Sequence, residues 1–394
     1  MSIALLYERS ESDENGIKLT AQQLGLDLTY IPFRKIALSI GSNGFSAKTK
    51  GKDYTQTFQD AKVVLNRSQS KNRRLQASYI LEVLGKKTLN SSQIEFMCYS
   101  KLRTLLNLYK EGIPIPQTVF VPCDATDTLK NGKEIHNQTD LADLFEQDLS
   151  LAEGIVIKAD AGTHGKMIML SKTREELENN IKETKPGLIN PVGVVAQELI
   201  QKWFYDLRII VSKEQGKEPV CYPVAMVRAG FKDFRTNTFL GNLVFDAKLP
   251  QSVQALALKC GKILSKDSSA WILALDAMVN VGKNKNADEV YLKSQLDLVA
   301  DAWGAVQKIK KDDSRLTNFN AWNTQLESQF MTYKHTSAYE NIKNIIEENL
   351  QTNSNALVFH EANSCPEFWE NTRLATGLNV AEPLLRGAKS LIDQ

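Results

Sequence analysis

Apolar residues in the N-terminal quarter of the chain follow two spacings, one typical of buried strands and one typical of amphipathic helices. Strands are expected at 3–7, 28–31 and 61–65, and helices at 17–24 and 74–84. Gly25 and Gly85 follow the two helical segments, where a glycine commonly ends a helix. Strands that alternate with helices favour a small parallel α/β unit over residues 1 to about 95. No G-x-G-x-x-G motif follows the first strand, so this unit is not expected to bind a dinucleotide.

The middle of the chain continues to alternate between the two patterns. Residues 100–110 predict a helix whose buried face consists of Leu102, Leu105, Leu106 and Tyr109. Further strands are expected at 153–158, 166–170, 194–200, 206–211 and 271–279, with one helix that begins near Thr173 and another at 251–265.

From about residue 283 to residue 353 the pattern changes to amphipathic helices without intervening strands. The expected helices are at about 289–311, 320–333 and 337–350. Apolar density returns only at 356–360, which predicts another strand. Because strands are expected on both sides of it, the stretch 283–353 is interpreted as a helical insertion that joins two adjacent strands.

The bulk composition narrows the class of protein. With 394 residues, 42% of them apolar, the chain can form two or three domains with a buried core. A net charge of +2 argues against nucleic-acid binding. The basic cluster Lys71, Arg73 and Arg74 is expected to lie in a solvated loop, with a contact to a phosphate or an acidic partner as the alternative. No apolar run predicts a membrane span, and the N-terminal residues lack the pattern of a signal peptide. The five scattered cysteines contain no C-x-x-C pair, which indicates a reducing cytoplasm and no zinc site.

A lysine and two glycines near residue 160 suggest a phosphate site. Lys158 ends an expected strand, and the loop 160–165 that follows it contains Gly162 and Gly165. Glycines let backbone N–H groups approach a phosphate, and a lysine that points inward is costly without an anion. An ordinary hairpin turn would explain the glycines equally well.

Several other polar residues end or interrupt the expected strands. Glu198 could accept a hydrogen bond from the amino group of adenine, although a plain strand end would look the same. Arg235 lies in a short polar loop, where its planar guanidinium would suit a phosphoryl group or an oxyanion, although a structural arginine–aspartate pair is the alternative. The remaining polar candidates in this stretch are Asp206, Arg208, Arg228 and Asn237.

Two acids and one amide predict a metal site. Asp276 lies inside the apolar strand 271–279, where a lone carboxylate would be unfavourable. Glu361 and Asn363 follow another apolar strand and share one face by the period of two. Carboxylate and amide oxygens suit Mg²⁺, which also binds phosphate oxygens. His360 is expected to pack, and Cys365 is not expected to be a nucleophile because no histidine base can be placed beside it.

In this order the motifs resemble the ATP-grasp superfamily and, within it, the RimK-like and LysX-like carboxylate–amine ligases. The resemblance covers about 1–282 and 355–394, through 66–67, Lys101 with 112–118, 156–158 with 162–165, 197–200, 206–208, 233–237, Asp276, 361–363 and 376–377. It implies an α/β and α+β architecture, the ATP-grasp fold, in three domains. These are an α/β pre-grasp domain over 1–97, a central lid domain over 98–195, and a C-terminal domain over 196–394 that carries the metal ligands and the helical insertion.

The resemblance also implies an activity and a role for each matching residue. The activity is ATP-dependent formation of an amide bond between a carboxylate and an amine, such as an α-amino acid like glutamate, through an acylphosphate. Nucleotide binding would involve Lys101, Lys158, Gly162, Thr163, His164, Gly165, Glu198, Leu199, Asp206, Arg235, Thr236 and Asn237. Mg²⁺, or alternatively Mn²⁺, would be held by Asp276, Glu361 and Asn363. Arg235 and Arg228 would be catalytic, and the substrate would contact Arg208, Asn237 and Ser364.

Two departures from the family pattern leave the substrates open. Glu367 stands where the family has a flexible glycine, and the insertion 283–353 is absent from the short members. The expected partners are a small-molecule carboxylate and an amino acid, with a carrier protein or a peptide tail as an alternative acceptor. The relatives also imply a homo-oligomer. A nucleotide-binding scaffold without ligase activity is the competing hypothesis.

Overall fold

A computed structural model of the chain describes residues 2–9, 11–42, 44–123, 137–161, 167–184 and 193–392. Its N-terminal unit is built on a four-stranded parallel sheet in the order β2-β1-β5-β6. The strands are β1 (Ser2–Tyr7), β2 (Leu28–Pro32), β5 (Ala61–Arg67) and β6 (Lys87–Leu89), and the helices are α1 (Ser12–Gln23), α2 (Thr55–Asp60), α3 (Lys71–Val83) and α4 (Ser92–Tyr99). The parallel α/β unit is therefore confirmed, while the hairpin of β3 (Ala37–Gly41) and β4 (Gly44–Lys48) was not expected.

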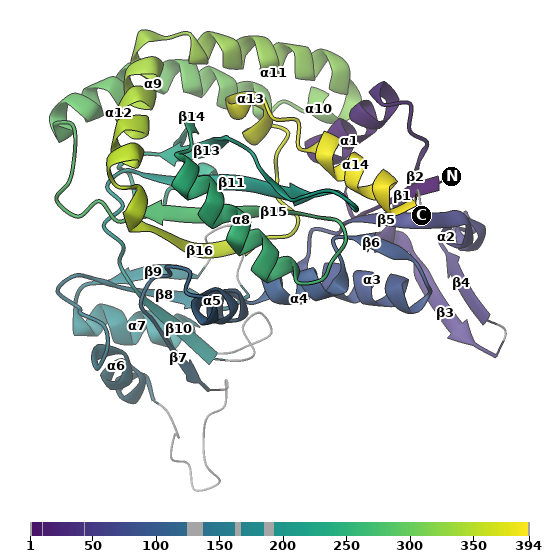
Figure 1. Cartoon of the computed structure of the whole chain (residues 1–394), viewed down its shortest axis with the longest axis horizontal. Helices are drawn as coiled ribbons and strands as arrows, with labels where there is room; N and C mark the ends of the chain where they lie inside the picture. Colours follow the sequence, from purple (N-terminus) through teal and green to yellow (C-terminus); the bar gives the residue numbers. More distant parts are fainter. Residues whose placement is uncertain are drawn as a thin grey trace, which may run out of the picture.

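The central unit is a four-stranded antiparallel sheet in the order β7-β10-β8-β9 (Figure 1). Its strands are β7 (Thr118–Pro122), β8 (Ile155–Ala159), β9 (Ile168–Ser171) and β10 (Gly193–Glu198), and α6 (Gln138–Glu146) and α7 (Arg174–Thr184) cover one face. Ile155 and Ile157 of β8 belong to the core beneath these helices. The period of two then directs Val156 and Lys158 to the opposite face, which is open to the site.

The C-terminal unit is a six-stranded antiparallel sheet in the order β14-β13-β11-β15-β16, with β12 paired to β11. The strands are β11 (Tyr205–Lys213), β12 (Val220–Cys221), β13 (Val224–Ala229), β14 (Leu243–Lys248), β15 (Trp271–Val279) and β16 (Leu357–Asn363). Helix α8 (Gln251–Ser265) packs on this sheet, and α13 (Thr372–Thr376) and α14 (Ala381–Ile392) follow its last strand. The expected helix at 251–265 and the expected strand at 271–279 have the predicted bounds.

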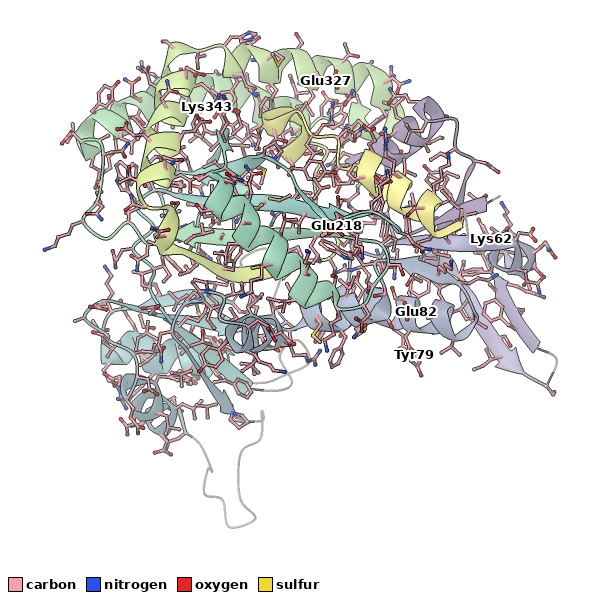
Figure 2. All side chains as sticks on the ribbon, viewed as in Figure 1. Lys62, Tyr79, Glu82, Glu218, Glu327 and Lys343 are labelled. Atoms are coloured by element: carbon pink, nitrogen blue, oxygen red, sulfur yellow. The ribbon has the colours of Figure 1, made fainter. Side chains whose placement is uncertain are left out.

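The helical insertion is confirmed as the connection between the neighbouring strands β15 and β16. It consists of α9 (Glu289–Lys310), α10 (Ser314–Thr317), α11 (Phe319–Lys334) and α12 (Ser337–Thr352), which form an outer layer at the top of Figure 1. Two insertion residues labelled in Figure 2 attach this layer to the rest of the C-terminal unit. Glu327 accepts a hydrogen bond from Arg373, and Lys343 pairs with Asp246 of β14 at 3.6 Å. The domain limits at 97 and 195 stay predictions.

One helix buries a face other than the one expected. Helix α5 (Lys101–Lys110) buries Lys101, Thr104, Leu105 and Leu108, whereas Leu106 and Tyr109 are exposed. The prediction ranked residues by hydrophobicity alone. It was right for Leu105 but wrong for Leu106 and Tyr109, because the face toward β16 also carries a lysine that lines the cavity. Among the described residues, no helix combines the length and apolar character needed to cross a membrane.

Candidate active site

A cavity of about 660 Å³ lies between the central unit, the C-terminal sheet and the start of α3. Of the predicted residues, those lining it are Lys101, Lys158, Glu198, Leu199, Asp206, Arg208, Arg228, Arg235, Thr236, Asn237, Asp276, Glu361 and Asn363. Gly162, Thr163, His164 and Gly165 lie outside the described residues. Ser364 is not part of the lining: it is buried, and its hydroxyl donates to Glu95 at 2.6 Å.

Two lysines from different elements meet at this cavity. Lys158 lies on β8, and Lys101 is the first residue of α5. Asp160 ties the two elements together, because its carboxylate accepts from the Ser100 hydroxyl at 2.9 Å and from the Leu102 N–H at 2.8 Å. The Lys101 N–H also donates to the Asp160 carbonyl at 3.1 Å. Asp160, which directly follows β8, is thereby bound to the N-terminus of α5.

The lysine pair is poised to receive an anion. Burial, reinforced by the neighbouring Lys101 charge, lowers the pKa of Lys158 to about 8. Burial also lowers the pKa of Lys101, although the Glu361 carboxylate 3.8 Å away acts against that shift. A polyanion bound between the two lysines would stabilise both charges.

The predicted metal ligands lie together on two paired strands. Asp276 of β15 is opposite Glu361 of β16, and the Asn363 side-chain amide donates to Asp276 at 3.4 Å. Arg208 holds Asp276 through two hydrogen bonds of 2.8 and 2.9 Å. Although burial opposes it, Arg208 and Arg228 hold the pKa of Asp276 well below its usual range.

Glu361 is held ionised by lysines rather than arginines. Its carboxylate lies 3.5 Å from Lys71 and 3.8 Å from Lys101. Burial raises the pKa of a carboxyl, but these two cations outweigh burial and lower the pKa of Glu361 to about 2. Both acids are therefore carboxylates at neutral pH.

The residues present fit a hard divalent cation that also binds phosphate. Asp276, Glu361 and Asn363 offer oxygen atoms on one wall of the cavity. Within the described part of the chain, no cluster of three or more histidine, cysteine, aspartate or glutamate side chains forms a closed metal site. Two carboxylates and one amide leave coordination positions for phosphate oxygens and water, as Mg²⁺ commonly requires.

A second charged network surrounds Asp206. Arg228 donates to one carboxylate oxygen at 2.6 Å, and the Thr236 hydroxyl donates to the other. Lys202 donates to Thr236 at 2.6 Å and lies 3.7 Å from Asp206. Both oxygens of Asp206 therefore contact protein groups. Burial lowers the pKa of Lys202 to about 8, although the Asp206 charge acts in the opposite direction.

Arg235 forms the arginine–aspartate pair that the sequence left as an alternative. It donates to Asp233 at 3.0 and 2.6 Å. The same guanidinium lies 3.5 Å from the Ile168 carbonyl of β9. Arg235 thus connects the loop that bears it to the central unit while still lining the cavity.

The end of the cavity near Glu198 is apolar. Pro116, Val156, Ile168, Leu199, Ile200 and Met278 line it. The Glu198 carboxylate accepts from the Gln117 N–H at 2.8 Å, and the Leu199 N–H donates to the Gly154 carbonyl at 3.0 Å. An apolar slot with polar strand ends suits a flat heteroaromatic ring.

Sequence reasoning missed several residues of the site. Arg74, expected in a solvated loop, is buried and pairs with Glu95 at 2.7 Å, while Lys71 is half-buried and pairs with Glu361. Lys202 and His360 also line the cavity, and the Nε2 atom of His360 finds no hydrogen-bond partner among the described residues. Burial and the Lys158 charge lower the pKa of His360 to about 4, so the ring is neutral. Of these residues, only Lys71 could have been suspected from the sequence, because it is a basic residue at the start of a helix that follows a strand.

Comparison with known proteins places the fold and the site in one class. Residues 100–300, just over half of the chain, match the RimK-like ATP-grasp domain. The α-aminoadipate–LysW ligase LysX of Sulfurisphaera tokodaii is 28% identical over 67% of this chain and 81% of its own length. The ribosomal protein bS6–L-glutamate ligase of Escherichia coli is 26% identical over 47% of this chain and 54% of its own. The fold is similar to that of D-cycloserine synthetase DcsG, with a TM-score of 0.56 and 11% identity over 100% and 99% of the two chains.

These matches define the fold as ATP-grasp. The chain belongs to the RimK-like ATP-grasp family, a family of ATP-dependent carboxylate–amine ligases. The expected fold class is thereby confirmed.

Proposed function

We propose that the chain uses ATP and Mg²⁺ to join a substrate carboxylate to the amino group of an α-amino acid such as glutamate. The observation that carries the proposal is the meeting of a lysine pair, Lys101 and Lys158, with the carboxylates Asp276 and Glu361 at one cavity. The lysines suit phosphate oxygens and the carboxylates suit the metal that accompanies them.

The proposed reaction has two steps. In the first, an oxygen of the substrate carboxylate attacks the γ-phosphorus of ATP, the bond to the β-phosphate oxygen breaks, and ADP leaves. In the second, the amine attacks the carbonyl carbon of the acylphosphate, the bond from that carbon to the phosphate oxygen breaks, and the amine loses a proton. The products are an amide, ADP and inorganic phosphate.

Each group has a role that its chemistry allows. Lys101 and Lys158 hold phosphate oxygens, and Asp276, Glu361 and Asn363 hold the metal. When bound, Mg²⁺ neutralises charge on the phosphate oxygens. Arg228 and Arg235 face the oxyanion that develops during amide formation, where a fixed cation lowers the barrier.

No side-chain nucleophile is needed in this scheme. Cys365 lines the cavity, but burial raises the pKa of its thiol, so it is protonated at neutral pH. The acylphosphate must instead be protected from water. The central unit, which carries Lys158, is the element that would exclude water by closing over ATP.

Isotope transfer tests the proposal directly. A candidate carboxylate labelled with ¹⁸O is incubated with the protein, ATP, Mg²⁺ and pooled amino acids, and the phosphate released is examined by mass spectrometry. One ¹⁸O atom per phosphate is expected, because the carboxylate oxygen leaves with the phosphoryl group. Release of unlabelled phosphate would contradict an acylphosphate intermediate. If the protein binds ATP tightly but produces no ADP with any carboxylate of a cell extract, the nucleotide-binding scaffold without ligase activity is favoured.

A protein or peptide acceptor is a second candidate. Two relatives are named for LysW and for ribosomal protein bS6, both proteins. Gln307, Lys310 and Arg315 of the insertion line the same cavity. Mass spectrometry of the proteins in an extract supplied with ATP and a labelled amino acid separates the two candidates, because only a protein acceptor retains the label after precipitation.

A further inference from the structure

The insertion reaches the cavity through three polar side chains. Gln307 and Lys310 are three residues apart on α9 and therefore share one face of that helix, and Arg315 lies on α10. All three line the cavity, together with Glu367, Glu370 and Asn371 from the segment after β16. The insertion is thus a wall of the site and not only a cover over the sheet.

Two of these side chains present donors that the described parts of the protein leave unused. The Nε2 atom of Gln307 and the Nε atom of Arg315 are buried and have no hydrogen-bond partner there. Lys310 is 8% exposed, and its ammonium donates to the Asn371 side chain at 2.6 Å and lies 3.8 Å from Glu370. Buried donors without acceptors are unfavourable, so the arrangement fits a ligand that brings acceptor oxygens.

This donor group is separate from the lysine pair. The charges that influence the pKa of Lys310 are Glu370 and Glu367, whereas those that influence Lys158 are Lys101, Glu361 and Lys202. The insertion donors therefore have acidic neighbours of their own, apart from the groups that act on Lys158. The lysine pair is assigned to the triphosphate, which leaves the insertion donors for another ligand.

Glu367 lines the same cavity as the insertion donors. Its charge acts both on Arg208, which holds Asp276, and on Lys310. A ligand bound to the insertion donors would share this cavity with the carboxylates Asp276 and Glu361. A zwitterion has the matching chemistry, with an anionic group at one end and an amine nearer Glu367.

We propose that Gln307, Lys310 and Arg315 form a subsite for an anionic group, carboxylate or phosphate, of the amine-bearing substrate. The inference rests on the proposed ligase function, since it assumes that the reacting amine lies near Asp276 and Glu361. The insertion then determines which amine is used, by requiring an acid on the same molecule.

Binding of defined probes tests the subsite without knowledge of the natural substrate. L-Glutamate, L-glutamine, L-isoglutamine and O-phospho-L-serine are titrated calorimetrically into the protein with ADP and Mg²⁺. Glutamate, or phosphoserine if the group is a phosphate, is expected to bind at least about tenfold more tightly than the amide that lacks the recognised acid. L-Glutamine lacks the side-chain carboxylate and L-isoglutamine lacks the α-carboxylate, so the weaker of the two amides identifies which carboxylate the subsite binds.

Variants of the insertion test whether it causes the preference for the acid over the amide. Lys310→Met and Arg315→Gln are each expected to reduce this preference about tenfold or more, while the affinity for ADP stays within twofold of the wild-type value. Lys308→Gln, an exposed position on the same helix, is the matched control and should keep the preference. If burial of Lys310 makes Lys310→Met unstable, the half-buried Arg315 still provides the test.

The outcomes are separable from those of the proposed function. Absence of binding by all four probes, equal affinity for acids and amides, or a preference that survives Arg315→Gln would overturn the subsite. A wild-type protein that shows the preference but never produces ADP would instead overturn the ligase proposal and leave the subsite in place.

Discussion

At the scale of single residues, every carboxylate expected to bind metal is neutralised by cations of the protein. Glu361 lies near Lys71 and Lys101, and Asp276 is held by Arg208 and Arg228. Buried charges without partners are strongly unfavourable, so the free protein needs these pairs. Binding of a metal nucleotide offers an exchange in which the metal takes the carboxylates and the phosphates take the cations.

Replacing Glu361 with alanine removes one side of this exchange. The variant lacks a metal ligand and leaves Lys71 and Lys101 without their carboxylate, so kcat for ADP formation is expected to fall at least about 100-fold. A coupled assay for ADP measures the effect. Glu218→Ala, at the exposed glutamate labelled in Figure 2, should retain full activity. Unchanged nucleotide consumption by Glu361→Ala would contradict the assigned site.

The lowered pKa of Lys158 predicts how nucleotide affinity depends on pH. The free protein loses this charge as pH rises through about 8, whereas bound phosphate favours the protonated form. The affinity for ADP and Mg²⁺ is therefore expected to be highest below pH 8 and to fall by up to about tenfold per pH unit above it.

Calorimetry between pH 7 and 9.5 measures this dependence. Lys158→Met should weaken binding and flatten the curve, leaving the smaller slope due to Lys101 and Lys202. Lys62→Met, at an exposed lysine labelled in Figure 2, should reproduce the wild-type curve. A slope as steep in Lys158→Met as in the wild type would show that this lysine does not contact phosphate.

At the scale of helices and strands, regular apolar spacing was enough to predict most elements. The strand β15 and the helix α8 follow directly from it, and so do the insertion helices. Prediction from apolar spacing fails where a polar residue is buried because it belongs to the site or to a buried ion pair. The face of α5 was wrong because Lys101 points inward, and α1 was expected to begin at Ile17 because its first turn is polar yet contains the buried Asp13 and Glu14.

One aromatic contact between the insertion and the sheet can be tested by a conservative change. The Tyr339 hydroxyl donates to the Asp246 side chain at 2.6 Å and accepts from the Asp246 N–H at 3.1 Å. Tyr339→Phe is expected to lower the free energy of unfolding by about 1–3 kcal/mol, because the buried Asp246 N–H loses its partner and the Asp246 carboxylate loses one of its partners. Urea unfolding measures it. Tyr291→Phe, at an exposed position of α9, should change stability little, and equal losses would refute the contact.

At the scale of the whole molecule, residues far apart in sequence bind the N-terminal unit to the rest. Arg67 pairs with Asp13 at 2.8 Å, and Asp13 accepts from the Trp369 N–H at 2.8 Å. Asn90 bonds to the Ile272 carbonyl and the Ser364 carbonyl, both at 2.7 Å. The order of motifs could reveal the family, but local spacing carries no information on these long-range pairs. For that reason Ser364 was expected at the substrate and is instead found in the core.

The packing of α1 on the C-terminal segment gives a prediction about the assembly of the chain. A Cβ atom at Gly16 would lie 2.0 Å from the Trp369 ring. Gly16→Ala is expected to cost about 1–3 kcal/mol, because the close approach of helix and indole is lost. Thermal unfolding and tryptophan fluorescence measure it.

A second helical glycine provides the control for that change. A Cβ atom at Gly304 of α9 would meet nothing within 4 Å, so Gly304→Ala should be neutral or stabilise by up to about 1 kcal/mol. Equal behaviour of the two variants would show that Trp369 does not pack tightly on α1.

The two strands that bear the metal ligands end beside each other, with Val279 paired to Leu357 and the Asn280 N–H bonded to the Ala356 carbonyl at 2.9 Å. A turn of about two to five residues could close such a gap. Because the cost of closing a loop grows only slowly with its length, this junction tolerates additions of almost any size. Evolution or an engineer can therefore exchange the segment between these ends and alter the choice of amine, while the apparatus that activates the acid stays where it is.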